Sequence, residues 1–145
     1  MVNKMKNEKY TTNSVNETID LGERIGTAIK SGAVVSLTGD LGVGKTAFTK
    51  GLALGLGIED TISSPTFTLM KEYEGRLDLK HIDAYRLEGV DSDSLGLFDL
   101  MDDRTVIVIE WGSFLDDLDF NVDYDINIKY IDETVREITV SEVEA

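Results

Sequence analysis

Cysteine is absent from this 145-residue chain, and proline occurs only once, at Pro65. The lack of cysteine excludes a disulfide framework and thiolate metal sites, so we expect the protein to be located in the reducing cytoplasm. No apolar run approaches the length of a membrane span, and we expect no contact with membranes. The first ten residues contain lysines with no apolar stretch behind them, so we expect no secretory signal.

Positive charge is also scarce, because 14 lysines and arginines face 28 aspartates and glutamates and leave a net charge of −14. Such a surface repels nucleic acid, whose binding draws largely on lysine and arginine displacing counterions. If the protein serves RNA or DNA metabolism, we expect a basic partner to make that contact. The alternative is that the charge serves solubility alone.

What remains is the composition of an ordinary globular protein, with 41% hydrophobic and 29% charged residues. The chain contains no internal repeat, low-complexity segment or linker, and residues 1–145 are expected to form one domain. Ser14 and Glu17 have the spacing of a capping box, which predicts a helix from about Ser14 to Ile29. The apolar run 33–38 predicts a buried strand, and a second helix is expected from about Lys45 to Leu56.

The second half of the chain favours strands. Residues 63–86 are predicted to form a hairpin with its bend at the sequence EGR, and 91–103 to carry a short amphipathic helix. The uninterrupted apolar run 105–111 predicts a central strand buried on both faces. Residues 123–143 alternate like two strands around an Asp-Glu-Thr turn. The pattern predicts an α/β domain with a mixed central sheet, parallel core strands, antiparallel side strands and helices on both faces.

The corner between the first predicted strand and the second helix carries the strongest motif. Gly39, Gly44, Lys45 and Thr46 match G-x-x-x-x-G-K-[ST], the P-loop of NTPases, between a strand and a helix as that motif requires. Main-chain amides and the helix N-terminus would cradle phosphates, Lys45 would reach the β- and γ-phosphates, and the Thr46 hydroxyl would bind Mg²⁺. The alternative is a glycine-rich turn that binds no ligand. The residues predicted to bind ATP are Gly39, Asp40, Leu41, Gly42, Val43, Gly44, Lys45, Thr46 and Ala47.

Hydrolysis would also need an acid on the metal side of the site. Two acids follow apolar strands, Glu110 in VIVIE and Asp83 in HIDAYR, and the ends of such strands are where open α/β sheets bind ligands. From position alone, both are candidates. Thr66 is a candidate switch residue touching Mg²⁺ or the γ-phosphate, or otherwise a turn hydroxyl.

Three further residues lie near these motifs. The single histidine, His81, is expected to be a hydrogen-bonded structural residue rather than a catalyst. Trp111 is expected to pack. Arg86 either supplies positive charge to the reaction or pairs with neighbouring acids.

The motifs GDLGVGKT, SSPTFTLMKEYE, HIDAYRL and IVIEW resemble, in order and approximate spacing, those of the TsaE (YjeE) family. TIDLGERI near the N-terminus and the arginine of ETVREITV extend the resemblance over nearly the whole chain. It implies a cytoplasmic P-loop ATPase needed for the threonylcarbamoyladenosine modification of tRNA. Such an ATPase docks on the TsaB and TsaD proteins and touches tRNA only through them.

The resemblance also assigns roles to residues. It implies that Lys45 and Thr46 hold phosphates and Mg²⁺, that Glu110 serves the metal and that Asp83 assists hydrolysis. Ser64–Phe67 would form a switch-like loop near the γ-phosphate. ATP turnover would reset the complex between rounds. Two departures from the family pattern are modest, namely Val43 in place of alanine and Gly112-Ser113 after the Glu-Trp pair.

Three other functions are weighed against this one. A GTPase would need an N-K-x-D segment on a late strand, which the chain lacks, so ATP is preferred. A P-loop small-molecule kinase would need an acceptor site and an arginine-bearing lid, for which no insertion is long enough. A nucleotide-dependent binding module, in which ATP orders a docking surface, is compatible with the ATPase and predicts slow turnover by the isolated chain.

Overall fold

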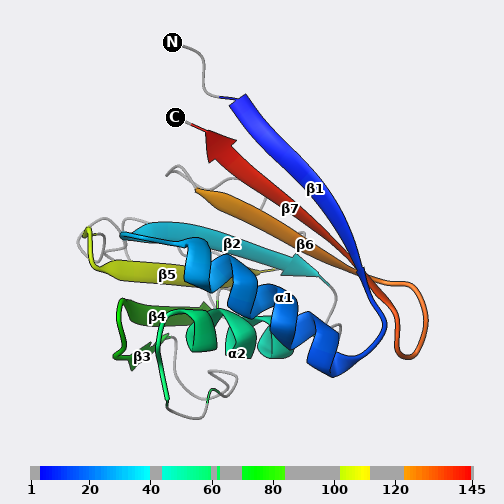
Figure 1. The fold of residues 1–145 in the computed structure, drawn as a ribbon, viewed down its shortest axis with the longest axis horizontal. Coiled ribbons are helices and arrows are strands. Elements are labelled where there is room, and N and C mark those ends of the chain that lie inside the picture. The colour runs from blue at the N-terminus through cyan, green and yellow to red at the C-terminus, as the bar shows by residue number, and fades with distance from the viewer. Residues whose placement is uncertain are drawn as a thin grey trace.

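Seven strands form one sheet in the computed structural model, which describes residues 4–39, 44–59, 62, 70–83, 102–111 and 123–144. The strands lie in the order β1-β7-β6-β2-β5-β4-β3 (Figure 1). The elements are β1 (Lys4–Thr12), α1 (Val15–Ala28), β2 (Ala33–Gly39), α2 (Lys45–Gly55), β3 (Met70–Tyr73), β4 (Asp78–Asp83), β5 (Thr105–Trp111), β6 (Tyr124–Tyr130) and β7 (Arg136–Glu144).

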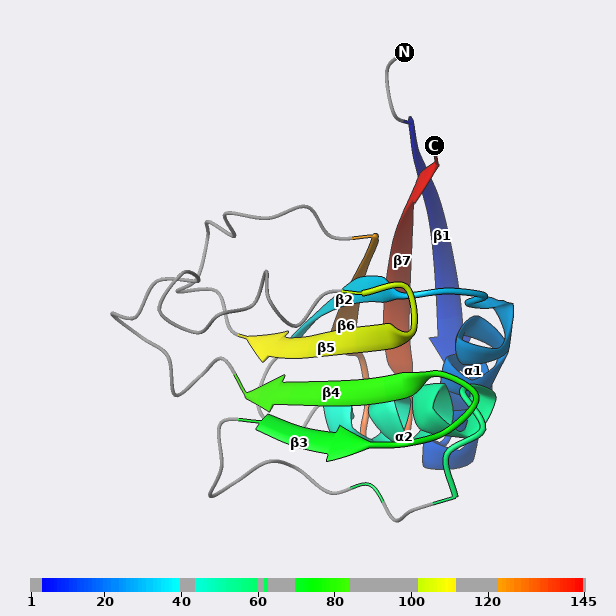
Figure 2. The same cartoon turned by 90° about the vertical axis from the view of Figure 1, so that its left-hand side faces the viewer.

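The sheet is mixed in the way the sequence predicts. Strands β6, β2, β5 and β4 run parallel to one another in the middle. β3 pairs antiparallel with β4 at one side, and β7 and β1 continue antiparallel from β6 at the other (Figure 2). The predicted hairpin and the two C-terminal strands are therefore confirmed. The carboxyl ends of the four parallel strands all lie at one edge of the sheet.

Helices α1 and α2 lie together on one face of this sheet (Figures 1 and 2). They follow the predicted boundaries, and Ser14 caps α1 as expected, since its Oγ accepts a hydrogen bond from the Glu17 N–H at 3.1 Å. The sequence predicts helices on both faces, and the two helices that the structure describes lie on the same face. The short helix expected over 91–103 falls almost wholly outside the described residues, so it stays a prediction.

The core lies between the two helices and the central strands. Alternate residues of β2, β5 and β6, such as Leu37, Val108 and Ile126, are fully buried against Phe48 and Leu52 of α2. Residues of β5 that point to the opposite face, Ile107 and Ile109, are also buried. The prediction that this strand is buried on both faces is therefore confirmed.

The two helices meet backbone to backbone through glycines. A Cβ atom added at Gly51 of α2 would lie 1.9 Å from the main-chain oxygen of Ile19, and one at Gly22 of α1 would lie 2.4 Å from that of Phe48. No side chain fits at such distances. The glycines therefore let α1 and α2 approach more closely than any other residue would permit.

Two features of the fold are absent from the sequence-based expectations. Strand β1 pairs with β7 along its whole length, with Tyr10 opposite Ile138. Arg76, in the β3–β4 turn, donates hydrogen bonds of 2.9, 3.1 and 3.0 Å to the carbonyl oxygens of Ile29, Gly26 and Gly55. One guanidinium thus satisfies carbonyls at the carboxyl ends of both helices.

Candidate functional site

The carboxyl edge of the parallel strands brings the predicted residues to one place. In the β2–β5 pair, Leu37 lies opposite Glu110, two residues before β2 ends at Gly39. In the β4–β5 pair, Asp83 lies opposite the same glutamate. The predicted phosphate-binding corner and both candidate acids therefore share the edge where open α/β sheets bind ligands.

The corner itself offers positive potential to an anion. α2 begins at Lys45 directly after Gly44, whose φ of 116° is a conformation that favours glycine. Gly44 has no side chain to cap the helix, and the first turn of α2 contains no acidic residue. The amides of this turn and the helix dipole are thus left without a negative partner from within the helix, which is the arrangement that anion sites use.

Lys45 is buried at this corner, with 5% of its surface exposed. Its Nζ donates a 2.9 Å hydrogen bond to the carbonyl oxygen of Gly39, so the ammonium group is held across the two ends of the loop. Burying an ammonium group is costly unless anions or several acceptors compensate it. Thr46 and Ala47 follow in the first turn and are half-buried.

Glu110 is the second buried charge-bearing group at this edge, with 5% of its surface exposed. Nε2 of His81 lies 3.0 Å from its Oε1. The two groups are not aligned as a hydrogen bond, and no other described residue gives Oε1 a hydrogen-bond partner. A buried carboxylate oxygen without a partner is unusual, since such atoms are nearly always satisfied.

The side-chain oxygens available at this site are of the kind that Mg²⁺ binds. Hydroxyl and carboxylate oxygens suit this hard cation, and Thr46 and Glu110 both lie at the carboxyl edge. Among the described residues, no three histidine, aspartate or glutamate side chains gather closely enough to hold a metal. Mg²⁺ usually takes only one or two protein ligands and completes its shell with water and phosphate oxygens. The described residues therefore fit Mg²⁺ arriving with a phosphate ligand.

His81 is more closely tied to the site than its sequence context suggests. Its side chain is fully buried, as expected for a structural histidine, but neither ring nitrogen forms an aligned hydrogen bond with a described residue, contrary to the expected hydrogen-bonded role. It lies opposite Val108 on the same face of the sheet as Glu110, two residues further from the carboxyl ends of the strands. The proximity of His81 to Glu110 could be inferred from the sequence only through the strand register. In that register Asp83 lies opposite Glu110, and His81 precedes Asp83 by two residues.

Several predicted residues lie outside the described part of the chain. These are Asp40, Leu41, Gly42, Val43, the segment 64–67 with Thr66, Arg86, and Gly112-Ser113. For Asp83 and Trp111 the structure describes the strand position but not the side chain. Their roles stay predictions.

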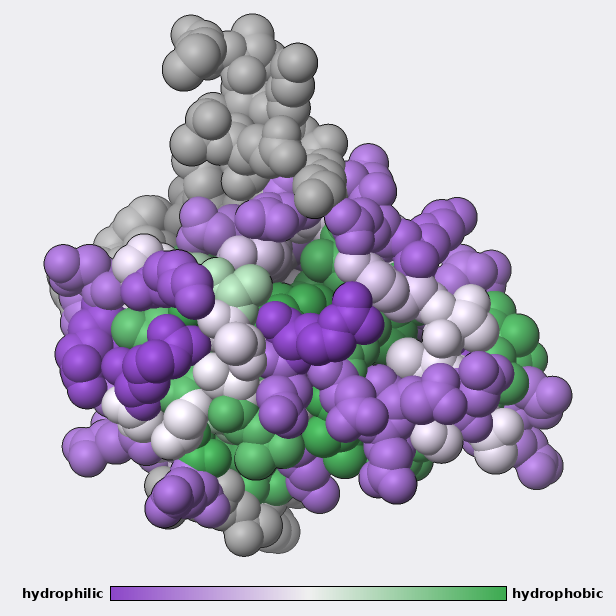
Figure 3. Space-filling model, in the orientation of Figure 1, coloured by the Kyte–Doolittle hydropathy of each residue, from purple (hydrophilic) through white to green (hydrophobic). Residues whose placement is uncertain are grey.

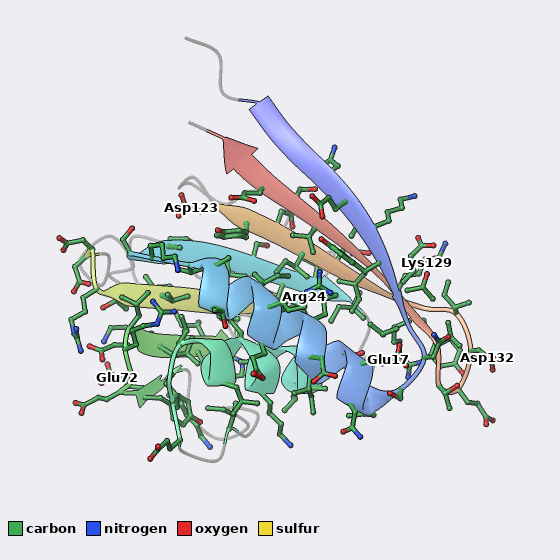
Figure 4. The ribbon with its side chains drawn as sticks, in the orientation of Figure 1. Glu17, Arg24, Glu72, Asp123, Lys129 and Asp132 are labelled. Carbon is green, nitrogen blue, oxygen red and sulfur yellow. The ribbon has the colours of Figure 1, made fainter. Side chains whose placement is uncertain are left out.

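A second hollow lies elsewhere, between α1 and strands β1, β6 and β7, where apolar surface is visible among hydrophilic residues (Figure 3). Its volume is about 260 Å³, and Arg24 of α1 reaches into it with its guanidinium 5.7 Å from the Tyr10 ring centre (Figure 4). Partial burial and the carboxylate of Glu142 raise the pKa of Tyr124 in its wall above the ordinary value. None of the predicted site residues lines this hollow.

Comparison with known proteins places these features in a family context. The sequence model described as "Threonylcarbamoyl adenosine biosynthesis protein TsaE" matches residues 12–138. Two relatives carry the name tRNA threonylcarbamoyladenosine biosynthesis protein TsaE. The one from Bacillus subtilis is 41% identical over 140 residues, covering 96% of this chain and 88% of the relative. The one from Treponema pallidum is 41% identical over 134 residues, covering 92% of this chain and 99% of the relative.

A solved structure gives the same result for the fold. The crystal structure of Bacillus subtilis YdiB superposes with a TM-score of 0.79 at 37% sequence identity, covering 96% of this chain and 87% of that one. Within the described residues, no helix is long and apolar enough to cross a membrane.

Proposed function

The chain belongs to the TsaE family, which acts in tRNA threonylcarbamoyladenosine biosynthesis, and from this premise we propose that it binds and hydrolyses Mg·ATP at the β2–α2 corner. The observation that carries the proposal is the buried ammonium group of Lys45 at the uncapped start of α2, beside the edge where the buried carboxylate of Glu110 lies. Such a pair of features suits a phosphate chain with its cation.

The chain's own groups divide the work of binding. Amides of residues 39–47 bind phosphate oxygens, and the α2 dipole adds its positive end. Lys45 exchanges the carbonyl of Gly39 for the β- and γ-phosphates, which are stronger acceptors because they are charged. Thr46 and Glu110 hold Mg²⁺. When bound, the ion neutralises charge that develops on the phosphates.

Hydrolysis requires groups near the γ-phosphate. We assign Asp83 to assisting the attack of water, because its strand position is level with Glu110 at the same edge. Thr66, in the S-P-T-F segment, is assigned to a switch role near the same phosphate. The family resemblance supports both assignments.

The partners are proposed on charge and family grounds. A net charge of −14 disfavours direct binding to tRNA, so contact with tRNA is assigned to the TsaB and TsaD proteins. The ATPase cycle then serves that assembly in the cytoplasm. If ATP orders a surface on which these partners dock, turnover by the isolated chain is expected to be slow and the partners should stimulate it.

Phosphate release tests this proposal. Hydrolysis is measured with the chain alone, with TsaB and TsaD added, and with candidate small phosphate acceptors. Partner-stimulated release without a phosphorylated product supports the ATPase, whereas a phosphorylated acceptor identifies a small-molecule kinase instead.

Binding is measured in parallel with a fluorescent ATP analogue. Lys45→Ala is expected to weaken binding at least about tenfold, since a charge-assisted contact contributes roughly 1.5–3 kcal/mol. Lys50→Ala, at an exposed position of the same helix, is the matched control and should bind like the wild type. Equal affinity of the wild type and Lys45→Ala would rule out phosphate binding at this corner.

A further inference from the structure

The His81–Glu110 pair leaves three buried polar atoms unsatisfied. Nδ1 and Nε2 of His81 and Oε1 of Glu110 are sealed from solvent and make no aligned hydrogen bond within the described part of the chain, although Nε2 and Oε1 lie 3.0 Å apart. Leaving buried polar atoms unpaired costs roughly 1–3 kcal/mol for each group. An apolar side chain on β4 would avoid that cost, so filling the core does not account for a histidine here.

The arrangement of the pair suggests what it does. The two residues lie on neighbouring parallel strands and face the same side of the sheet, with His81 behind Glu110 as seen from the carboxyl edge. The His81 side chain is fully buried, whereas Glu110 keeps a small exposed fraction, 7% of its side chain. Any effect of His81 on the site must therefore pass through the carboxylate.

We infer that His81 is a positioning residue which holds Oε1 of Glu110 so that the other carboxylate oxygen is presented to Mg²⁺. The inference rests on the proposed function, because it takes Glu110 as the metal-side acid. Nε2 lies 3.0 Å from Oε1, so a small rotation of the ring would turn an N–H onto that oxygen. The hydrogen bond formed in this way would fix the rotation of the carboxylate and leave one oxygen for the cation. Mg²⁺ needs this restriction because its octahedral shell tolerates little distortion. Partners behind a metal ligand commonly affect metal affinity 10–100-fold.

The test compares full-length variants by binding of a fluorescent ATP analogue in EDTA and at increasing free Mg²⁺. His81→Met removes the donor but keeps an apolar side chain of similar length. It should bind the analogue in EDTA within about twofold of the wild type, yet need roughly tenfold more Mg²⁺ for half-maximal tightening. His81→Gln should restore the wild-type requirement, because its amide carries an N–H near the position of Nε2.

Coupling to Glu110 provides the second readout. Glu110→Gln should raise the Mg²⁺ requirement as His81→Met does. The double variant should need no more Mg²⁺ than either single variant, because both substitutions act on the same carboxylate. If His81→Met does not fold, as judged by circular dichroism, His81→Asn replaces it. Its amide is too short to reach Glu110, so it should raise the Mg²⁺ requirement while His81→Gln does not.

The outcomes separate this inference from the proposed function. A wild-type Mg²⁺ requirement in His81→Met, or in its replacement His81→Asn, overturns the positioning role. An equal increase in the Gln variant does the same, because it reports lost packing and not a lost donor. A wild-type protein that binds no nucleotide, or binds it without regard to Mg²⁺, refutes the proposed function and this inference with it.

Discussion

Replacing Gly51 by alanine tests how tightly α1 packs against α2, the helix that begins at the proposed phosphate-binding corner. An ideal Cβ at this position lies 1.9 Å from the carbonyl oxygen of Ile19 and 2.9 Å from the amide nitrogen of Glu23. Both atoms belong to the α1 backbone, so neither can rotate away. The first contact is about 1.5 Å short of the 3.4 Å at which ordinary contact begins, and the helices must separate by a comparable distance.

Two opposing terms set the size of the effect. Overpacking a well-packed interface costs typically about 1–3 kcal/mol, and a clash against backbone belongs at the upper end or beyond it. Alanine in place of glycine gains about 1 kcal/mol of helix propensity. The clash is larger than the gain, and we expect a net loss of roughly 2–3 kcal/mol. For a chain of 145 residues this lowers the unfolding midpoint by about 6–10 °C.

Thermal unfolding followed by circular dichroism measures this change. Lys50→Ala, one residue earlier and exposed, is the matched control and should shift the midpoint by less than about 2 °C. If helix propensity alone governed the site, Gly51→Ala would raise the midpoint. A midpoint equal to or above that of the wild type would therefore refute the backbone contact between α1 and α2.

Variants at two further positions are tested by the same melting experiment. Arg76→Ala removes three hydrogen bonds to the carboxyl ends of α1 and α2 and should cost about 2 kcal/mol; an unchanged midpoint would show that solvent replaces them without loss. Ser14→Ala removes the cap of α1 and should cost about 1 kcal/mol, whereas Ser14→Asp should stay within a few tenths of the wild type. Equal destabilisation by both Ser14 substitutions would contradict the capping role.

The features that could be predicted from the sequence are those whose signal is local. The capping box at Ser14 and Glu17 places the start of α1, and the P-loop motif places the corner before Lys45, because each depends on residues within one turn. The apolar run 105–111 identifies β5 as a central strand, since burial on both faces leaves no room for polar alternation.

The features that the sequence did not reveal depend on contacts between distant segments. β1 carries lysines, a glutamate and two threonines and shows no clear apolar alternation; its pairing with β7 makes it a strand. Gly51 gives no local sign of the α1 backbone against it. The proximity of His81 to Glu110 follows only once the β4–β5 register is known.

The most direct test of the central claim is the change in amide NMR chemical shifts when Mg·ATP is added to the protein. We expect the largest changes at Gly44, Lys45, Thr46 and Ala47, with a further change at Glu110. The amide chemical shifts of residues around the second hollow, such as Arg24 and Tyr124, should not change. Unchanged amides at 44–47 under saturating Mg·ATP, or changes centred on the second hollow, would contradict it.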